Sequence, residues 1–206
     1  MGKEKDNIAV LILAAGASTR MGKIKQLLPW RNSTLLEHAV QQANQVSKDI
    51  FVVLGANANE IEQKVPNNVD IIHNPNWKEG MGSSISCGVS TIESKERFRA
   101  ILIMLADQPL IDPDYLVKML TSYDSNNYKI IATSYGVSNG VPAIFSKSVF
   151  VELKKLNKDY GARKLMERYS YTLKAIDPKG KEIDIDTPET YEFLKQGNNQ
   201  SKIIKK

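Results

Sequence analysis

Continuous apolar runs recur along the chain, separated by loops that contain glycine or charged residues. The two longest runs, 8–14 and 100–105, consist entirely of Ala, Val, Ile, Leu and Met. Such runs are typical of strands in a parallel sheet, because these strands are buried on both faces. The pattern predicts strands over 8–14, 50–54, 69–72, 100–105, 130–133 and 141–145.

Amphipathic stretches lie between these runs and predict helices. Leu36, Ala39 and Val40 recur at helical spacing, and Thr34 with Glu37 is the residue pair of a capping box at the start of that helix. Asp112 followed by Pro113 indicates the start of another helix. Further helices are predicted over 59–65, 81–92, 148–156, 162–169 and 188–195.

Strands that alternate with helices form βαβ units. The sequence therefore predicts an α/β fold with a mostly parallel sheet. The chain of 206 residues contains no linker-like stretch and no repeat. We expect one domain over 1–196, followed by a polar, basic tail over 197–206.

Composition narrows the possible functions. One cysteine and two histidines exclude a disulfide framework and make a metal site built from these residues improbable. The net charge of +5 is mild, and the chain lacks the dense basic stripe with aromatic residues that nucleic-acid binding requires. No apolar run reaches the roughly 18 residues of a membrane span, and the polar start lacks a signal-peptide core. We therefore expect a cytoplasmic protein without a membrane or nucleic-acid partner.

The loop after the first predicted strand combines small residues with cations. Gly16 and its small neighbours let backbone N–H groups approach phosphate oxygens, and Arg20 and Lys25 add positive charge. The loop has neither Walker A spacing nor a Gly-x-Gly-x-x-Gly pattern. The alternative is a surface loop in which the glycines only turn the chain.

Aspartates mark two other loops. Asp107 directly follows the apolar run 100–105, where burial of a carboxylate is costly unless a cation compensates. Asp184 and Asp186 share one side if their segment is extended, and with Asp107 they could hold Mg²⁺ through oxygen atoms alone. In the alternative, Asp107 stabilises a turn, and Asp186 before Thr187 and Pro188 only starts a helix.

Taken together, these segments resemble the molybdenum cofactor nucleotidyltransferases, which belong to the NTP transferase superfamily. The resemblance extends over about 10–194. Its motifs are LAAGASTRMG from Leu13, the following Lys25 with LLP at 27–29, GMGSSI from Gly80, ADQP at 106–109, NGVP at 139–142, DYGAR at 159–163 and DIDTPE at 184–189.

The resemblance implies a three-layer α/β/α Rossmann-like fold and assigns roles to individual residues. Asp107 would hold Mg²⁺ with Asp186 or Asp184. Arg20 and Lys25 would bind the triphosphate and, with Asp107, carry the catalysis. Many relatives have Asn, Pro or Gly where this chain has Lys23 and Ile24, so Lys23 could share the phosphate role. The remaining nucleotide contacts would come from Leu13, Ala14, Ala15, Gly16, Ser18 and Ser84, and the acceptor contacts from Gly140, Pro142, Gly161 and Arg163.

The activity that the resemblance implies is transfer of CMP from CTP to the phosphate of molybdenum-bound molybdopterin, with release of pyrophosphate. A molybdoenzyme that receives the product is a possible partner. Ala15 occupies a position where guanylyl members tend to have Gly, which favours CTP over GTP. The alternatives are GTP as the donor, a sugar or polyol phosphate as the acceptor, or a non-catalytic module that delivers the cofactor.

Overall fold

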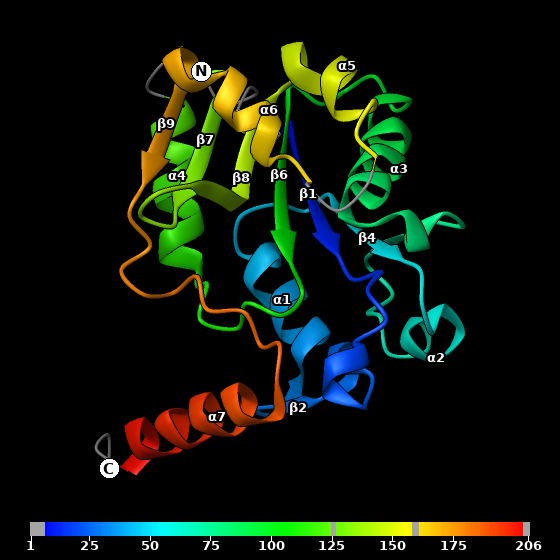
Figure 1. Cartoon of the computed structure of the whole chain (residues 1–206), viewed down its shortest axis with the longest axis vertical. Helices are drawn as coiled ribbons and strands as arrows, with labels where there is room; N and C mark the ends of the chain where they lie inside the picture. The colour runs from blue at the N-terminus through cyan, green and yellow to red at the C-terminus, as the bar shows by residue number, and fades with distance from the viewer. Residues whose placement is uncertain (1–6, 125–126, 158–160, 204–206) are drawn as a thin grey trace.

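A seven-stranded sheet forms the centre of the protein (Figure 1). The computed structural model describes residues 7–124, 127–157 and 161–203. The strand order is β5-β4-β1-β6-β8-β7-β9, and β8 is antiparallel to both of its neighbours. The strands are β1 (Ile8–Leu13), β4 (Ile50–Leu54), β5 (Asp70–His73), β6 (Ala100–Leu105), β7 (Ile130–Ser134), β8 (Asn139–Ser146) and β9 (Leu173–Ile176).

Helices cover both faces of this sheet, so the predicted three-layer α/β fold is confirmed (Figure 1). Val10 and Ile12 of β1 pack toward one face, and Ala9 and Leu11 pack toward the other, because successive side chains of a strand alternate. The first face is covered by α1 (Leu35–Asn44), α2 (Ala58–Glu62) and α4 (Pro113–Asp124). The second is covered by α3 (Met81–Glu93), α5 (Phe150–Leu153) and α6 (Arg163–Arg168).

The capping box of α1 forms as predicted. Thr34 Oγ1 accepts a hydrogen bond from the backbone N–H of Glu37 at 3.2 Å, and the Glu37 carboxylate accepts one from the N–H of Thr34 at 2.7 Å. Two N–H groups at the helix start, which have no partner within the helix, are satisfied in this way.

Two features of the sheet were not predicted. The edge strand β9 has only four residues, of which only Ile176 is buried, so it lacks an apolar run. β8 is buried on both faces by the helices around it, and a doubly buried strand has the same apolar pattern in either direction. Sequence periodicity therefore cannot show that β8 runs antiparallel.

A third apolar cluster anchors the C-terminal helix α7 (Pro188–Ile203) below the sheet (Figure 1). Tyr191 and Leu194 pack with Trp30 from the short hairpin of β2 (Pro29–Trp30) and β3 (Ser33–Thr34). Tyr191 also donates a hydrogen bond to the carbonyl of Pro29 at 2.6 Å. The helix predicted over 188–195 thus continues to Ile203, into the segment expected to be a tail.

The carboxyl ends of β1, β4 and β6 meet at the edge of the sheet from which α7 projects (Figure 1). The segment 177–187 connects β9 to α7 along this edge. The backbone N–H of Ile185 donates to the carbonyl of Asp107 at 2.9 Å and fixes the segment against the loop after β6. Ligands of open parallel sheets bind at such an edge. No helix among the described residues is long and apolar enough to cross a membrane.

Close packing of α3 on the sheet depends on Gly88. A Cβ atom at this position would lie 2.6 Å from Leu11 Cδ2 and 3.1 Å from Val53 Cγ2. Gly88→Ala should therefore lower the free energy of unfolding by about 1–3 kcal/mol despite the better helix propensity of alanine. Urea unfolding measures the change. Gly197→Ala is the matched control, because its Cβ would meet no atom within 4 Å, and equal stability of the two variants would contradict the prediction.

Candidate active site

Gln26 fixes the shape of the loop after β1. Its amide group Nε2 donates to the carbonyls of Ala14 at 2.8 Å and Gly16 at 3.0 Å, and its Oε1 accepts from Ser18 Oγ at 3.2 Å. Ser18 Oγ in turn accepts from the backbone N–H of Lys25 at 3.2 Å. Gln26 is only 5% exposed, so these bonds lie in a protected environment. Its side chain holds the glycine loop open toward solvent.

The loop leaves backbone donors available. Among the described residues, no hydrogen bond is donated by the backbone N–H of Gly16 or Ala17. Ser18 and Gly22 adopt left-handed backbone conformations, with φ of 56° and 63°. The chain therefore turns sharply at both residues. Successive free N–H groups in a turn of this kind suit phosphate oxygens.

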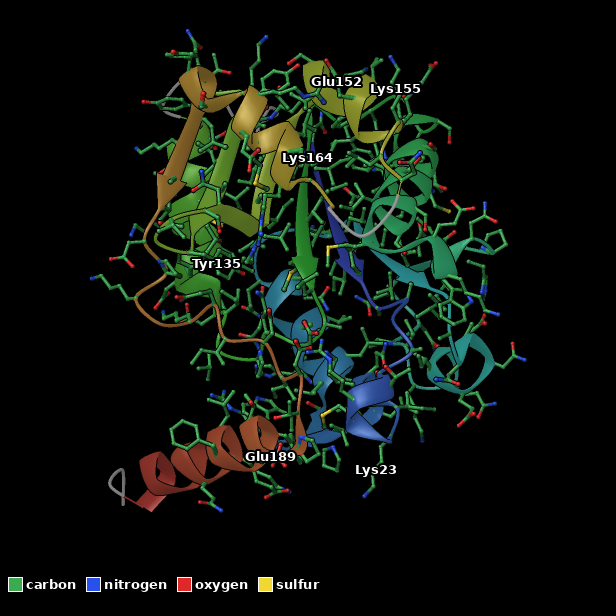
Figure 2. All side chains as sticks on the ribbon, viewed as in Figure 1. Lys23, Tyr135, Glu152, Lys155, Lys164 and Glu189 are labelled. Carbon is green, nitrogen blue, oxygen red and sulfur yellow. The ribbon has the colours of Figure 1, made fainter. Side chains whose placement is uncertain are left out.

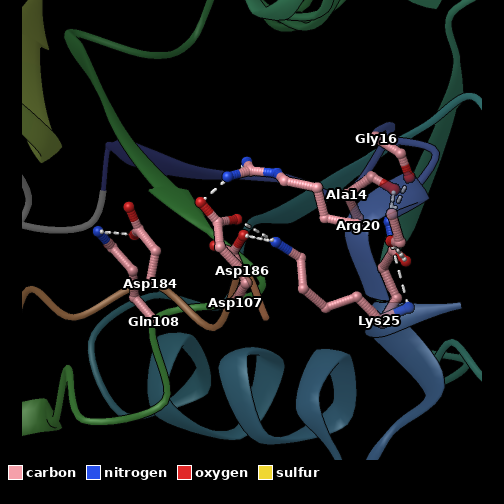
Figure 3. A network of polar contacts seen from close by, with 10 residues as sticks. Ala14, Gly16, Arg20, Lys25, Asp107, Gln108, Asp184 and Asp186 are labelled. Carbon is pink, nitrogen blue, oxygen red and sulfur yellow. Dashed lines mark hydrogen bonds and ion pairs between the residues drawn. The ribbon is translucent and has the colours of Figure 1, made fainter. Parts of the chain in front are cut away.

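Four charged side chains meet beside this loop (Figure 3). Lys25 Nζ lies 2.5 Å from Asp107 Oδ2 and 3.0 Å from Asp186 Oδ1. Arg20 reaches the other oxygen of Asp186 at 3.0 Å. The structure thus brings together Arg20, Lys25 and Asp107, which lie on two different loops, and adds Asp186 from the segment before α7.

Burial and charge act in opposite directions in this cluster. Burial alone would lower the pKa of Lys25, but attraction and hydrogen bonds from Asp107 and Asp186 outweigh it and raise the pKa above its usual value. Burial would raise the pKa of Asp186, yet Lys25 and Arg20 hold it below its usual value. Both side chains therefore remain charged at neutral pH.

The carboxylates are suited to a divalent cation. Asp107 Oδ1 is buried and has no hydrogen-bond partner among the described residues. An unpaired buried carboxylate oxygen is costly, and a hard cation would satisfy it. Lys25 bridges the carboxylates of Asp107 and Asp186. No group of three or more His, Cys, Asp or Glu side chains that could hold a metal occurs in the described part of the chain.

Asp184 has different partners from Asp186. Its Oδ1 accepts a hydrogen bond from Gln108 Nε2 at 2.8 Å (Figure 3). The segment is not assigned to a strand, and Ile185 between the two aspartates is fully buried, whereas both aspartates are partly exposed. Burial and repulsion from Asp107 raise the pKa of Asp184 to about 6. The two aspartates differ in their partners, since Asp184 bonds to Gln108 whereas Asp186 bonds to Arg20 and Lys25.

A cleft of about 470 Å³ opens above the cluster. Its lining includes residues 13–18, Trp77 and Ser84, together with the charged side chains of Arg20, Lys25, Asp107 and Asp186. Ser84 Oγ accepts a hydrogen bond from Asn74 at 3.1 Å, so its position is fixed. Every residue predicted to contact the nucleotide lines this cleft. Lys23 does not line it and points away from the protein (Figure 2).

A second cavity of about 290 Å³ adjoins the cleft. Both are lined by Met81 and Leu105. Three of the residues predicted to contact the acceptor line this cavity, namely Gly140, Gly161 and Arg163. Pro142 does not line it, since it is buried within β8 and its carbonyl accepts a hydrogen bond from Thr133. Asp159 and Tyr160 of the DYGAR motif lie outside the described residues.

Three buried amide side chains that support the site were not predicted from the sequence. Gln26, Gln108 and Asn74 are buried amides whose hydrogen bonds position the loop, Asp184 and Ser84 respectively. Gln26 follows Lys25 and Gln108 follows Asp107, so both lie next to residues that were predicted to belong to the site. This proximity in the sequence could have indicated their supporting role. Nothing near Asn74 in the sequence indicated its role.

Similarity to known proteins identifies the family of the chain. The family model described as "MobA-like NTP transferase domain" matches residues 10–173. The chain belongs to this family. It is 28% identical to the molybdenum cofactor cytidylyltransferase of Escherichia coli K12 over 192 residues, which cover 92% of this chain and 96% of the relative.

Other relatives carry different names. The chain is 29% identical to the nicotine blue oxidoreductase of Paenarthrobacter nicotinovorans, over 87% of this chain and 92% of the relative. The crystal structure of Rv0371c from Mycobacterium tuberculosis H37Rv in complex with manganese is 26% identical and covers 92% of this chain and 98% of the solved chain, with a TM-score of 0.74. Because relatives of similar identity carry different names, family membership does not by itself identify the molecule that receives the nucleotidyl group.

Removing the Gln26 amide should loosen the loop after β1. Gln26→Leu keeps the side chain's bulk but leaves the buried Ala14 carbonyl without its hydrogen bond, which should lower the free energy of unfolding by about 2–3 kcal/mol. Urea unfolding measures this loss, and hydrogen exchange should become faster at the backbone N–H groups of Met21 and Lys25, which donate hydrogen bonds to Ser18 within the loop. Gln63→Leu, at an exposed position, is the control. Unchanged exchange in the loop would show that Gln26 does not hold it.

Proposed function

We propose that this protein transfers CMP from CTP to the phosphate of molybdenum-bound molybdopterin and releases pyrophosphate. The observation that carries the proposal is the charged cluster of Lys25, Asp107 and Asp186, which lies in a cleft that continues into a second cavity. Two joined compartments with charges at one end suit a reaction between two phosphorylated molecules. The relative from Escherichia coli supports the choice of donor and acceptor.

The cleft would hold the nucleotide. The N–H groups of the loop at Gly16 and Ala17 would bind phosphate oxygens, and Arg20 and Lys25 would neutralise the charge that develops on departing pyrophosphate. Ser84, which also lines the cleft, would contact the base. Leu13, Ala14, Ala15 and Ser18 would shape the remaining wall.

Asp107 and Asp186 would hold Mg²⁺. When bound, the metal supplies positive charge that counters the negative charge of the phosphates during transfer. The unpaired Asp107 Oδ1 and the manganese complex of a relative support this assignment. Lys25 would keep both carboxylates ionised and oriented.

No general base is required for this reaction. The phosphate of the acceptor is already an anionic nucleophile, so its proton does not have to be removed. The chain's contribution would be to position two reactants and to balance their charge. A site without a reactive histidine or cysteine is consistent with such a role.

Asp107→Asn tests the metal ligand. The amide keeps the shape of the side chain but weakens metal binding, so pyrophosphate release with CTP, molybdopterin and Mg²⁺ should fall about 10³-fold, which corresponds to a loss of several kcal/mol of charge stabilisation. Asp70→Asn, which only removes an ion pair with Lys95 outside the site, should retain wild-type rates.

Wild-type turnover in Asp107→Asn at saturating Mg²⁺ would refute the role of Asp107. If the wild type releases pyrophosphate from CTP only with a sugar or polyol phosphate, the acceptor is a different one. If it binds molybdopterin but never releases pyrophosphate with any nucleotide, the delivery function holds instead.

Ala15 should influence the choice of base. It lines the cleft and is only 6% exposed, so its methyl group takes up space beside the nucleotide. Ala15→Gly should lower the ratio of kcat/KM for CTP over GTP about tenfold, in keeping with the discrimination that one methyl group provides. Ala17→Gly changes loop flexibility in the same loop and is the control. An unchanged ratio in Ala15→Gly would exclude this methyl group as a selector.

A further inference from the structure

The three aspartates of the site divide between its two compartments. Asp107 and Asp186 line the cleft, whereas Asp184 lines only the second cavity. A carboxylate that is half-buried beside Asp107 costs free energy through desolvation and repulsion. Among the described residues, Asp184 forms no ion pair with Lys25 or Arg20 that would offset this cost. Its carboxylate therefore suggests a role other than metal binding.

A buried amide orients the Asp184 carboxylate. Gln108 is 3% exposed, and its Nε2 donates to Asp184 Oδ1 at 2.8 Å and to the Tyr135 hydroxyl at 2.7 Å. Tyr135, just beyond β7 at the edge of the sheet (Figure 2), donates its own proton to the Val141 carbonyl at 2.7 Å. The hydroxyl proton of Tyr135 is therefore not available to a ligand. Asp184 Oδ2 has no hydrogen-bond partner among the described residues, so it can accept from a ligand.

The walls of the cavity suit a flat ring. Met81, Ile85, Leu105 and Met166 are apolar, and they form a surface on which a heterocycle can pack. Arg163 adds the one cationic side chain among the described lining residues, which suits the anionic part of an acceptor. The cavity thus combines apolar walls with an oriented hydrogen-bond acceptor, whereas a sugar phosphate would offer hydroxyl groups and no ring face.

We propose that Asp184 is a specificity-determining residue that accepts hydrogen bonds from the ring N–H and the 2-amino group of a 2-amino-4-oxo heterocycle, such as the pterin of the acceptor. This assignment rests on the proposed function and gives its acceptor cavity a chemical selectivity. A carboxylate matches an edge with two adjacent donors and repels an edge that presents a carbonyl. Asp184 therefore selects the acceptor, and the metal is left to Asp107 and Asp186.

Two ring compounds that differ at one group test this assignment. Pterin carries an amino group at position 2 and lumazine a carbonyl, and both are fluorescent, so binding is measured by fluorescence titration without any turnover. The wild-type protein should bind pterin about tenfold or more tightly than lumazine, because a site that reads an N–H group rejects the analogue that lacks it.

The Asp184→Asn variant separates the role in binding from a structural one. Asparagine keeps an oxygen to accept the Gln108 hydrogen bond, so the melting temperature should remain close to wild type, but its amide offers a donor where the carboxylate offered an acceptor. The preference for pterin should disappear or reverse in favour of lumazine. Asp177→Asn, at an exposed position in the same segment, should retain the wild-type preference.

Equal affinity of the wild type for the two compounds, absence of pterin binding at millimolar concentration, or an unchanged preference in Asp184→Asn would overturn the assignment. The proposed function is tested separately, by CTP binding and pyrophosphate release with molybdopterin. Nucleotidyl transfer without pterin preference would refute only the role of Asp184. Pterin preference without pyrophosphate release from any nucleotide would refute the transferase and leave a pterin-binding protein.

Discussion

The ammonium group of Lys25 connects three parts of the chain that are far apart in sequence. It comes from the loop after β1 and contacts Asp107, 82 residues later, and Asp186, 161 residues later. Without it, two carboxylates would face each other across the site with only the exposed Arg20 to balance them. The site depends on this partly buried cation, because it holds the negative charges in place while leaving one oxygen of Asp107 unpaired.

The sheet makes this arrangement possible. Parallel strands β1 and β6 are adjacent, so the loops that carry Lys25 and Asp107 emerge side by side at one edge. The hydrogen bond between Ile185 and Asp107 then brings the segment before α7 to the same edge. Two amide side chains complete the site, because Gln26 donates hydrogen bonds to the glycine loop and Gln108 donates one to Asp184.

The sequence was sufficient for features that depend on local pattern. The buried strands β1, β4 and β6, the capping box of α1 and the α/β class follow from apolar runs and short-range chemistry, and the structure confirms them. The meeting of Arg20, Lys25 and Asp107 followed from strand ends and from family resemblance. The direction of β8, the edge strand β9 and the different partners of Asp184 and Asp186 depend on contacts between distant segments. Such contacts leave no periodic signal, as the hydrogen bond between Gln108 and Asp184 illustrates, because it joins residues 76 positions apart.

The anchoring of α7 on the Trp30 hairpin has a consequence for the distance between the two compartments. The segment 177–187 is attached to the sheet through β9 at one end and to the apolar cluster of Tyr191 and Leu194 at the other. The single residue Ile185 separates Asp186, which lines the cleft, from Asp184, which lines the cavity. This short covalent spacer limits how far apart the two carboxylates can lie, whatever side chains form the rest of the pocket walls.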